Sequence, residues 1–170
     1  LISYRLKNEK LVKLKKTDKI VIKDKKYQIK IFENQLDGSE HFALIKGKIS
    51  PQKNTRVRVI SSNLVESYLL GKQLPNSFNN TLDYFKDYNN CILVFIRDSN
   101  LKSVSSTLRD FKSNRKNKTG TDKLIRNYGI GAQIIKALRV RNMILVTRSP
   151  KKVIGLEGFG IKITKQEIVK

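Results

Sequence analysis

The 170-residue sequence predicts a mixed α/β (α+β) domain in which an antiparallel β meander is followed by an α/β half. Two observations predict this class. In the first third of the chain, short stretches of alternating polar and apolar residues are separated by polar turns. In the last third, helical and strand patterns follow one another closely. Hydrophobic residues make up 39% of the chain, which is enough for a core at this length.

The meander is expected from three strands, over residues 27–33, 41–46 and 55–60. Leu36–Ser39 is a turn signal between the first two. Short polar connections favour antiparallel neighbours, so we expect the three strands to lie side by side. Residues 1–26 are polar and rich in lysine. We interpret them as a linker from an upstream domain, or a short strand, that leads into a domain over 27–170.

The middle of the chain predicts two short helices, Leu64–Leu70 and one around Leu82–Phe85, before a buried strand at Cys91–Ile96. From Asp98 to Asp122 the composition changes, because Ser, Asn, Lys and Arg dominate. Such a segment has few apolar residues to bury. We therefore expect a mobile basic loop over 98–122.

The last third predicts helix, strand, helix and strand. Four apolar residues fall on one face of a helix that follows Tyr128: Ile130, Ile134, Ile135 and Leu138. Met143–Thr147 has the pattern of a buried strand. Ser149 and Pro150 are typical of a helix start, so a helix is expected from there to about Leu156. Ile161–Thr164 closes the domain as a strand.

The charge is strongly positive, with 36 Lys and Arg against 14 Asp and Glu, a formal net charge of +22. This charge attracts polyanions of any kind. The single cysteine, Cys91, lies in an apolar run, which excludes an internal disulfide framework and a cluster of metal-binding thiolates. A buried reduced thiol is typical of a cytoplasmic protein, which is the location we expect. No apolar stretch approaches the roughly 20 residues of a membrane helix, so we expect no membrane contact.

The C-terminal motifs resemble those of GTP cyclohydrolase II, an enzyme of riboflavin biosynthesis, nearly position by position. The matching segments are Tyr128–Ile135 (YGIGAQII), Met143–Thr147, Pro150–Lys152 and Gly155–Gly158. Leu36–Gly38, Glu40–His41 and Val57–Val59 are similar to the first strands of the family, in order. The opening Leu1–Leu6 resembles the segment that joins a dihydroxybutanone phosphate synthase domain to the cyclohydrolase domain in bifunctional proteins. The resemblance implies a GTP cyclohydrolase II-like fold, and we expect a homodimer.

The chemistry that the resemblance implies is metal-assisted hydrolysis, in which zinc held by three cysteines activates water that opens the guanine ring. The positions that match the cysteines are Asn63, Leu74 and Asn76. We therefore expect no zinc, no other cofactor and no ring opening. The family's catalytic arginine matches Arg126, but Leu124 replaces the aspartate two residues before it. Positions that contact GTP, or support that contact, match Arg58, Thr147 and Lys152, which we interpret as candidate phosphate-binding residues.

Three functions remain open. The leading hypothesis is a degenerate GTP cyclohydrolase II-like domain that acts as a structural or dimerising module of a dihydroxybutanone phosphate synthase. The second is a zinc-independent enzyme domain that binds GTP or another phosphate ligand and uses Arg126. The third is a polyanion (RNA)-binding module that works through the basic residues 109–123. The sequence disfavours it, because aromatic residues are not interleaved with the basic ones. His41 is expected to be structural, and Gln133 either structural or part of a site.

Overall fold

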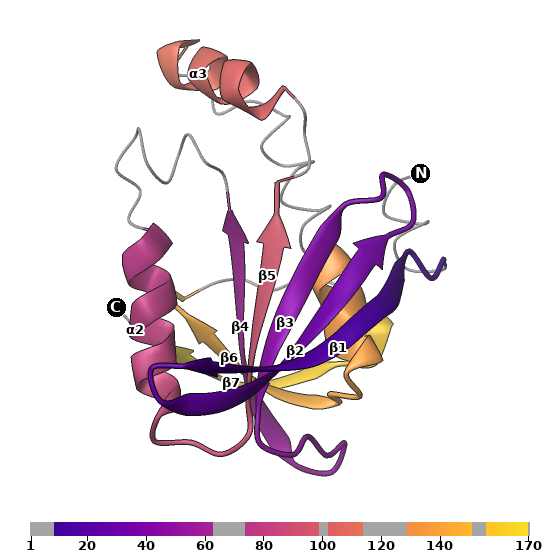
Figure 1. The fold of residues 1–170 in the computed structure, drawn as a ribbon, viewed down its shortest axis with the longest axis vertical. Coiled ribbons are helices and arrows are strands. Elements are labelled where there is room, and N and C mark those ends of the chain that lie inside the picture. Colours follow the sequence, from indigo (N-terminus) through magenta and orange to yellow (C-terminus); the bar gives the residue numbers. More distant parts are fainter. Residues whose placement is uncertain (1–8, 63–73, 99–101, 114–128, 151–155, 170) are drawn as a thin grey trace.

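The computed structural model describes residues 9–62, 74–98, 102–113, 129–150 and 156–169 (Figure 1). In them, seven strands form one sheet in the order β1-β2-β3-β5-β4-β6-β7. The strands are β1 (Val12–Ile22), β2 (Lys25–Asn34), β3 (Glu40–Lys46), β4 (Asn54–Ser62), β5 (Cys91–Arg97), β6 (Asn142–Thr147) and β7 (Lys162–Ile168). The helices are α2 (Leu74–Phe85), α3 (Ser103–Ser113), residues 129–137 and a short 3₁₀ turn, η2 (Glu157–Phe159).

The sheet combines an antiparallel half with a parallel half, which confirms the mixed class. Strands β1, β2 and β3 pair antiparallel in chain order. Strand β5 joins β3 antiparallel, whereas β5, β4, β6 and β7 run parallel to one another. Parallel neighbours need long crossovers, and α2 lies in the connection from β4 to β5. The carboxyl ends of the parallel strands therefore meet at one edge of the sheet.

The position expected for the third meander strand is wrong. The strand itself is present as β4, but it lies between β5 and β6 and does not pair with β3. The reason is the apolar run of β5, Cys91–Ile96, which is buried along almost all of its length. A strand buried on both faces takes a central position in a sheet. Strand β5 therefore lies between β3 and β4, so that the connection from β3 to β4 joins two strands that are not neighbours in the sheet.

Residues 1–26 were expected to form a linker or a short strand, and the structure has a long strand in this segment. Residues 12–22 form β1, which pairs with the whole of β2. Lys23 and Asp24 connect the two strands, with φ of 49° and 59°. Positive φ at both central residues is typical of a type I′ hairpin turn. The length of this strand was not expected, because nearly all of its side chains after Val12 are exposed and it shows little apolar alternation.

The expected loop over 98–122 is also wrong in part, because residues 103–113 form α3. Val104, Leu108 and Phe111 recur at helical spacing within its polar composition. The helix expected at Leu82–Phe85 is confirmed as the end of α2. Leu64–Leu70 and the start of the helix expected after Pro150 lie outside the described residues. No helix in the described parts of the chain is long and apolar enough to cross a membrane.

The core has two layers, one on each face of the sheet. Helix 129–137 covers one face and α2 the other, on opposite sides of the strands in Figure 1. The first face packs Ile130, Ile134 and Leu138 against Phe32, Val57 and Ile92. The second packs Leu82 and Phe85 against Leu44 and Leu93. Alternate residues of β3 and β5 therefore serve different layers, as the two-residue period of a strand requires.

Candidate functional site

Arg58 lies in the middle of the interior strand β4, beside the carboxyl end of β6. It is the register partner of Val146 on β6 and is only 8% exposed. Its Nη1 donates to the backbone oxygen of Val146 at 3.3 Å, and its Nη2 donates to Ser77 Oγ on α2 at 3.0 Å. Its Nε is buried and has no hydrogen-bond partner among the described residues. The guanidinium is thus positioned by two elements, and its Nε donor is not used by either of them.

Arg56, two residues earlier on the same strand, shows what a fully partnered arginine looks like here. Its Nε and Nη2 donate to the carboxylate of Glu167 at 3.2 and 3.3 Å. Its guanidinium carbon lies 3.6 Å from the centre of the Tyr88 ring, a cation–π contact. The side chain of Arg56 therefore joins β4, β7 and the end of the α2 segment through charge and packing.

Arg58 lacks such an acid: in the part of the chain that the structure describes, no carboxylate forms an ion pair with it. Burial lowers the pKa of Arg58, and the positive charge of Arg148 lowers that pKa further. Arginine keeps its proton even so, because its ordinary pKa lies far above neutrality. A buried cation with an unused donor and a second cation nearby suits an anionic ligand, whose oxygens would accept from Nε and neutralise the charge.

Three of the other candidate positions are described by the structure: Thr147, Asn76 and Leu74. Thr147 ends β6 and is buried, and its Oγ1 donates to the backbone oxygen of Ser149 at 2.9 Å. Asn76 is exposed in the first turn of α2, next to the Ser77 that binds Arg58. The structure therefore brings Arg58, Asn76 and Thr147 to one end of the sheet. Leu74 begins α2. Asn63, Arg126 and Lys152 lie outside the described residues.

Ser77 and Arg148 belong to this site and were missed in the sequence. Arg148 directly follows the buried strand Met143–Thr147, and a basic residue at the end of a parallel strand is a usable signal. Ser77 carries no such signal. Its role follows only from the packing of α2 against β4, which brings residues 19 positions apart into contact.

His41 is structural, as expected. It is 1% exposed, and its Nδ1 accepts the backbone N–H of Arg97 at 3.0 Å. The proton therefore lies on Nε2, which faces Ser39 Oγ at 3.1 Å. Ser39 Oγ in turn donates to the Asp37 carboxylate at 2.5 Å. Burial lowers the pKa of His41, and the charge of Asp37 only partly opposes this. Both ring nitrogens are occupied.

Cys91 is also structural. It begins β5, is fully buried under α2, and burial raises the pKa of its thiol to about 11. A neutral thiol is a poor metal ligand, since metals bind the thiolate. In the described part of the chain, no three His, Cys, Asp or Glu side chains are grouped closely enough to hold a metal ion.

Gln133 fastens the start of β1 to helix 129–137. Its Oε1 accepts the backbone N–H of Leu11 at 2.8 Å and of Val12 at 3.2 Å, while its Nε2 donates to the Glu9 oxygen at 2.9 Å. These three bonds all go to backbone groups, which supports the structural alternative for Gln133. In the same helix, a Cβ on Gly131 would lie 3.5 Å from Val59, in ordinary contact.

Comparison with known proteins identifies similar sequences over nearly the whole chain. The profile of the family described as GTP cyclohydrolase II matches residues 14–168. The chain is 31% identical over 172 residues to the monofunctional riboflavin biosynthesis protein RIBA 2, chloroplastic, of Arabidopsis thaliana, covering 96% of this chain and 35% of that protein. It is 28% identical over 177 residues to the riboflavin biosynthesis protein RibBA of Chlorobium phaeovibrioides, covering 98% and 43%.

A solved structure has a similar fold. It is the crystal structure of RibBX, a two-domain 3,4-dihydroxy-2-butanone 4-phosphate synthase from A. baumannii, with a TM-score of 0.61 and 21% identity. The match covers 99% of this chain and 43% of that one. The chain thus spans between about a third and just under half of the length of these proteins.

Proposed function

Because the chain belongs to the GTP cyclohydrolase II family of riboflavin biosynthesis, we propose that it is a degenerate member that holds no zinc and does not open the ring of GTP. Its role is then that of a structural or dimerising module of a dihydroxybutanone phosphate synthase. The observation that carries the proposal is the replacement of all three zinc-binding cysteines by other residue types. Asn63, Leu74 and Asn76 stand where the family has cysteines, and none of these side chains supplies a thiolate.

No other part of the chain offers a replacement set of soft ligands. The whole sequence contains one cysteine and one histidine. Cys91 is a buried neutral thiol under α2, and His41 uses both ring nitrogens within the fold. Zinc sites take three or four ligands of the Cys, His and carboxylate types. The donor set therefore does not fit zinc, and we derive no catalytic step through a metal.

The synthase part of the proposal is supported by the lengths of the relatives. The structural match covers 99% of this chain but only 43% of the A. baumannii protein, a two-domain dihydroxybutanone phosphate synthase. A chain of this length accounts for one of two such domains. In this proposal the catalysis resides in the companion domain, and the present domain contributes packing and association. Light scattering of the full-length protein tests the association, with a dimer expected and a monomer contradicting it.

Metal content and turnover test the degeneracy directly. The full-length protein, purified without chelator, is analysed for zinc by mass spectrometry and for formate release from GTP. We expect substoichiometric zinc and no formate, while an active family member, assayed in parallel, gives both. Stoichiometric zinc together with formate would reject the proposal. Stoichiometric zinc without formate would reject the claim that the domain holds no zinc, but it would agree with the claim that the domain does not open the ring of GTP.

Retained phosphate binding at Arg58 is a second candidate function, favoured by the orphaned Nε and the absence of an acid partner among the described residues. Calorimetry with GTP and with pyrophosphate is the test, and Arg58→Met the decisive variant. Arg141→Met removes the same charge from an exposed position and is the matched control. We expect the first change, and not the second, to weaken binding about tenfold or more. Absence of binding at millimolar ligand would eliminate this function, and the zinc-independent enzyme with it.

A further inference from the structure

A polar cavity lies away from Arg58, at the end of the sheet where the parallel strands begin. It has a volume of about 550 Å³ and is formed by β2, β3, the segment after β3 and the end of helix 129–137. Gly47, in its lining, follows β3 and faces Asn89, which precedes β5. The cavity is therefore at the amino ends of the parallel strands. Its volume is within the range of small-molecule pockets, about 300–1,000 Å³.

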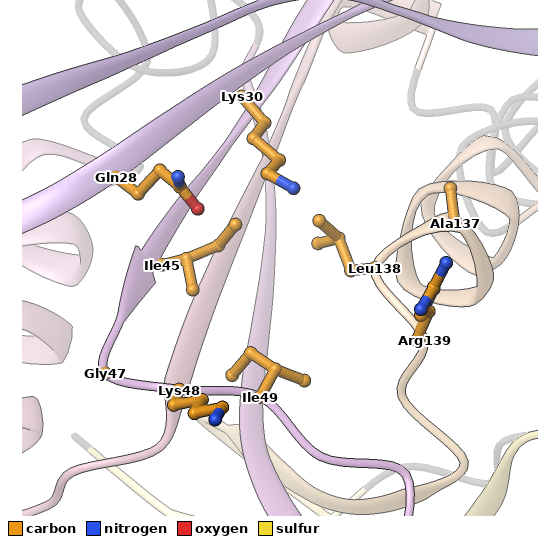
Figure 2. Close-up of a pocket in the computed structure, with 9 residues that line it drawn as sticks. All are labelled: Gln28, Lys30, Ile45, Gly47, Lys48, Ile49, Ala137, Leu138 and Arg139. Atoms are coloured by element: carbon orange, nitrogen blue, oxygen red, sulfur yellow. The ribbon is translucent and has the colours of Figure 1, made fainter.

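Three cations and one amide line this cavity: Lys30, Lys48, Arg139 and Gln28 (Figure 2). Lys30 and Gln28 are two residues apart on β2, so both project from the same face, and Figure 2 shows their polar ends turned toward the centre. Arg139 stands at the opposite rim. Cations from three separate segments thus line one space.

None of these cations is neutralised within the described residues. Other lysines form ion pairs with carboxylates: Lys15 pairs with Glu33 and Glu40, and Lys23 pairs with Asp83. Lys30, Lys48 and Arg139 form no ion pair and no side-chain hydrogen bond with any described residue, and the amide of Gln28 forms none either. Like charges placed together repel one another, so the arrangement favours an anion among them.

Arg139 occupies a backbone position that usually belongs to glycine. Its N–H donates to the oxygen of Lys136, and the N–H of Val140 donates to the oxygen of Ile135. This pair of bonds is the Schellman motif, with Arg139 as the left-handed residue after the helix. Its φ is 63°, a conformation that is unfavourable for a residue with a Cβ. The helix end is closed by backbone bonds alone, so the arginine side chain is not needed to close it.

The floor of the cavity is apolar. Ile45 and Leu138 are 5% and 7% exposed and line it beside Ile49. Small-molecule sites commonly combine such a floor with a few convergent polar groups. The cavity therefore offers contacts to an apolar body as well as to an anionic group.

We propose that this cavity binds a small phosphorylated organic molecule. The phosphate lies among Lys30, Lys48 and Arg139, and the organic body lies on Ile45 and Leu138. Guanidinium and ammonium groups are the protein's usual phosphate ligands, and a phosphate has enough oxygens for all three. The site is separate from Arg58 and does not depend on the function proposed above.

Calorimetry on the full-length protein at fixed ionic strength tests the proposal with three probes: phenyl phosphate, inorganic phosphate and phenol. We expect phenyl phosphate to bind about tenfold more tightly than inorganic phosphate, because its ring leaves water for the apolar floor. Phenol is expected not to bind. Equal affinity for the two phosphates, or binding of phenol, would overturn the proposal.

Variants separate the cavity from the general attraction of a chain with net charge +22. Lys48→Gln and Lys30→Gln are each expected to weaken phenyl phosphate about tenfold. Lys53→Gln removes the same charge from an exposed position nearby and is expected to change nothing.

Arg139→Gly distinguishes a ligand contact from a structural effect. Glycine is the preferred residue at this backbone position, so the melting temperature is expected to stay the same or rise while phenyl phosphate binding falls. An equal loss in Lys53→Gln and Lys48→Gln would overturn the proposal in favour of diffuse charge attraction. Displacement of phenyl phosphate by a short RNA that binds through the same three residues would overturn it in favour of nucleic acid.

Discussion

The side-chain oxygen of Gln133 accepts the backbone N–H of Leu11 at 2.8 Å, across 122 positions of the sequence. The same oxygen accepts the next backbone N–H, that of Val12, at 3.2 Å. One amide in the YGIGAQ segment therefore holds the first strand of the sheet onto the helix that covers it. A residue inside a family motif serves here to join the two ends of the domain.

Replacing Gln133 with leucine is expected to destabilise the domain by about 3 kcal/mol. The change leaves two buried N–H groups and one carbonyl without their partner, and each such loss costs about 1–3 kcal/mol before water compensates. Urea unfolding measures the effect. Gln35→Leu, at an exposed position, is the control and is expected to change stability by less than about 0.5 kcal/mol. Equal effects of the two changes would contradict this role.

Gly38 and Gly47 have similar left-handed backbone conformations but different surroundings, so alanine at the two positions distinguishes backbone strain from steric overlap. Gly38 and Gly47 have φ of 69° and 78°. A Cβ on Gly38 meets nothing within 4 Å, whereas a Cβ on Gly47 would overlap the backbone oxygen of Asn89. Gly38→Ala is expected to cost about 1 kcal/mol, the penalty of the left-handed conformation. Gly47→Ala is expected to cost about 3 kcal/mol or more. Chemical denaturation of both variants is the measurement, and similar losses would count against the close approach.

Cys91 is expected to be almost unreactive in the folded protein. Its pKa of about 11 leaves very little thiolate at pH 8, about a hundredfold less than an ordinary cysteine has. Ellman's reagent at pH 8 should react slowly without urea and rapidly in urea. Because the folded state keeps the thiol neutral, its contribution to stability is present below about pH 8.5 and is lost as pH rises toward 11. Fast reaction of the folded protein would contradict this burial.

His41 makes stability depend on pH on the acidic side. Burial lowers the pKa of its imidazole below the ordinary value of about 6.5, so folding favours the neutral ring. The stability that this provides is present above pH 6.5 and is lost as pH falls below it, at up to about 1.4 kcal/mol per pH unit. Urea unfolding at pH 7.5 and 5.5 should show the loss, and His41→Asn should reduce it. Because the chain has one histidine, its NMR titration is a direct check, and a midpoint above 6.5 would refute the prediction.

Arg58→Met is expected to raise the free energy of unfolding by about 1 kcal/mol in the absence of anions. A methionine of similar length removes a buried charge that has no acid partner among the described residues. Pyrophosphate should stabilise the original protein and leave the variant unaffected, since a ligand stabilises only the state that binds it. Thermal unfolding with and without millimolar pyrophosphate gives both results. A less stable variant would mean that the bonds to Val146 and Ser77 outweigh the cost of burying the charge.

The local patterns predicted the strands and helices well where burial alternates or is continuous. Strands β2, β3, β5 and β6 fall where expected, because each places a regular apolar pattern against a helix. Helix α3 was missed and strand β1 was expected only as a linker or a short strand, since most of their described side chains face solvent. The order of strands was not predictable from local pattern either. It depends on which strand is buried on both faces, a property of the whole sheet.

The candidate site was predictable only in part, and for a similar reason. Arg58 and Thr147 came from the resemblance, and the structure places them at one end of the sheet. The partner Ser77 and the missing acid could not be read from the sequence, because both are matters of distance between elements. The cavity lined by Lys30, Lys48 and Arg139 had no signal in the sequence. Its lining comes from residues 28–49 and 137–139, which meet only in the folded domain.

Strand β1 lies at an open edge of the described sheet, and that edge carries Lys13, Lys15, Lys16 and Lys19. An uncovered edge offers backbone groups to any other strand, including the same edge of another copy. Lysines along it make such edge-to-edge pairing unfavourable, because two copies would bring like charges into register. The lysines of this segment thus oppose aggregation through the exposed edge of the β1–β2 hairpin.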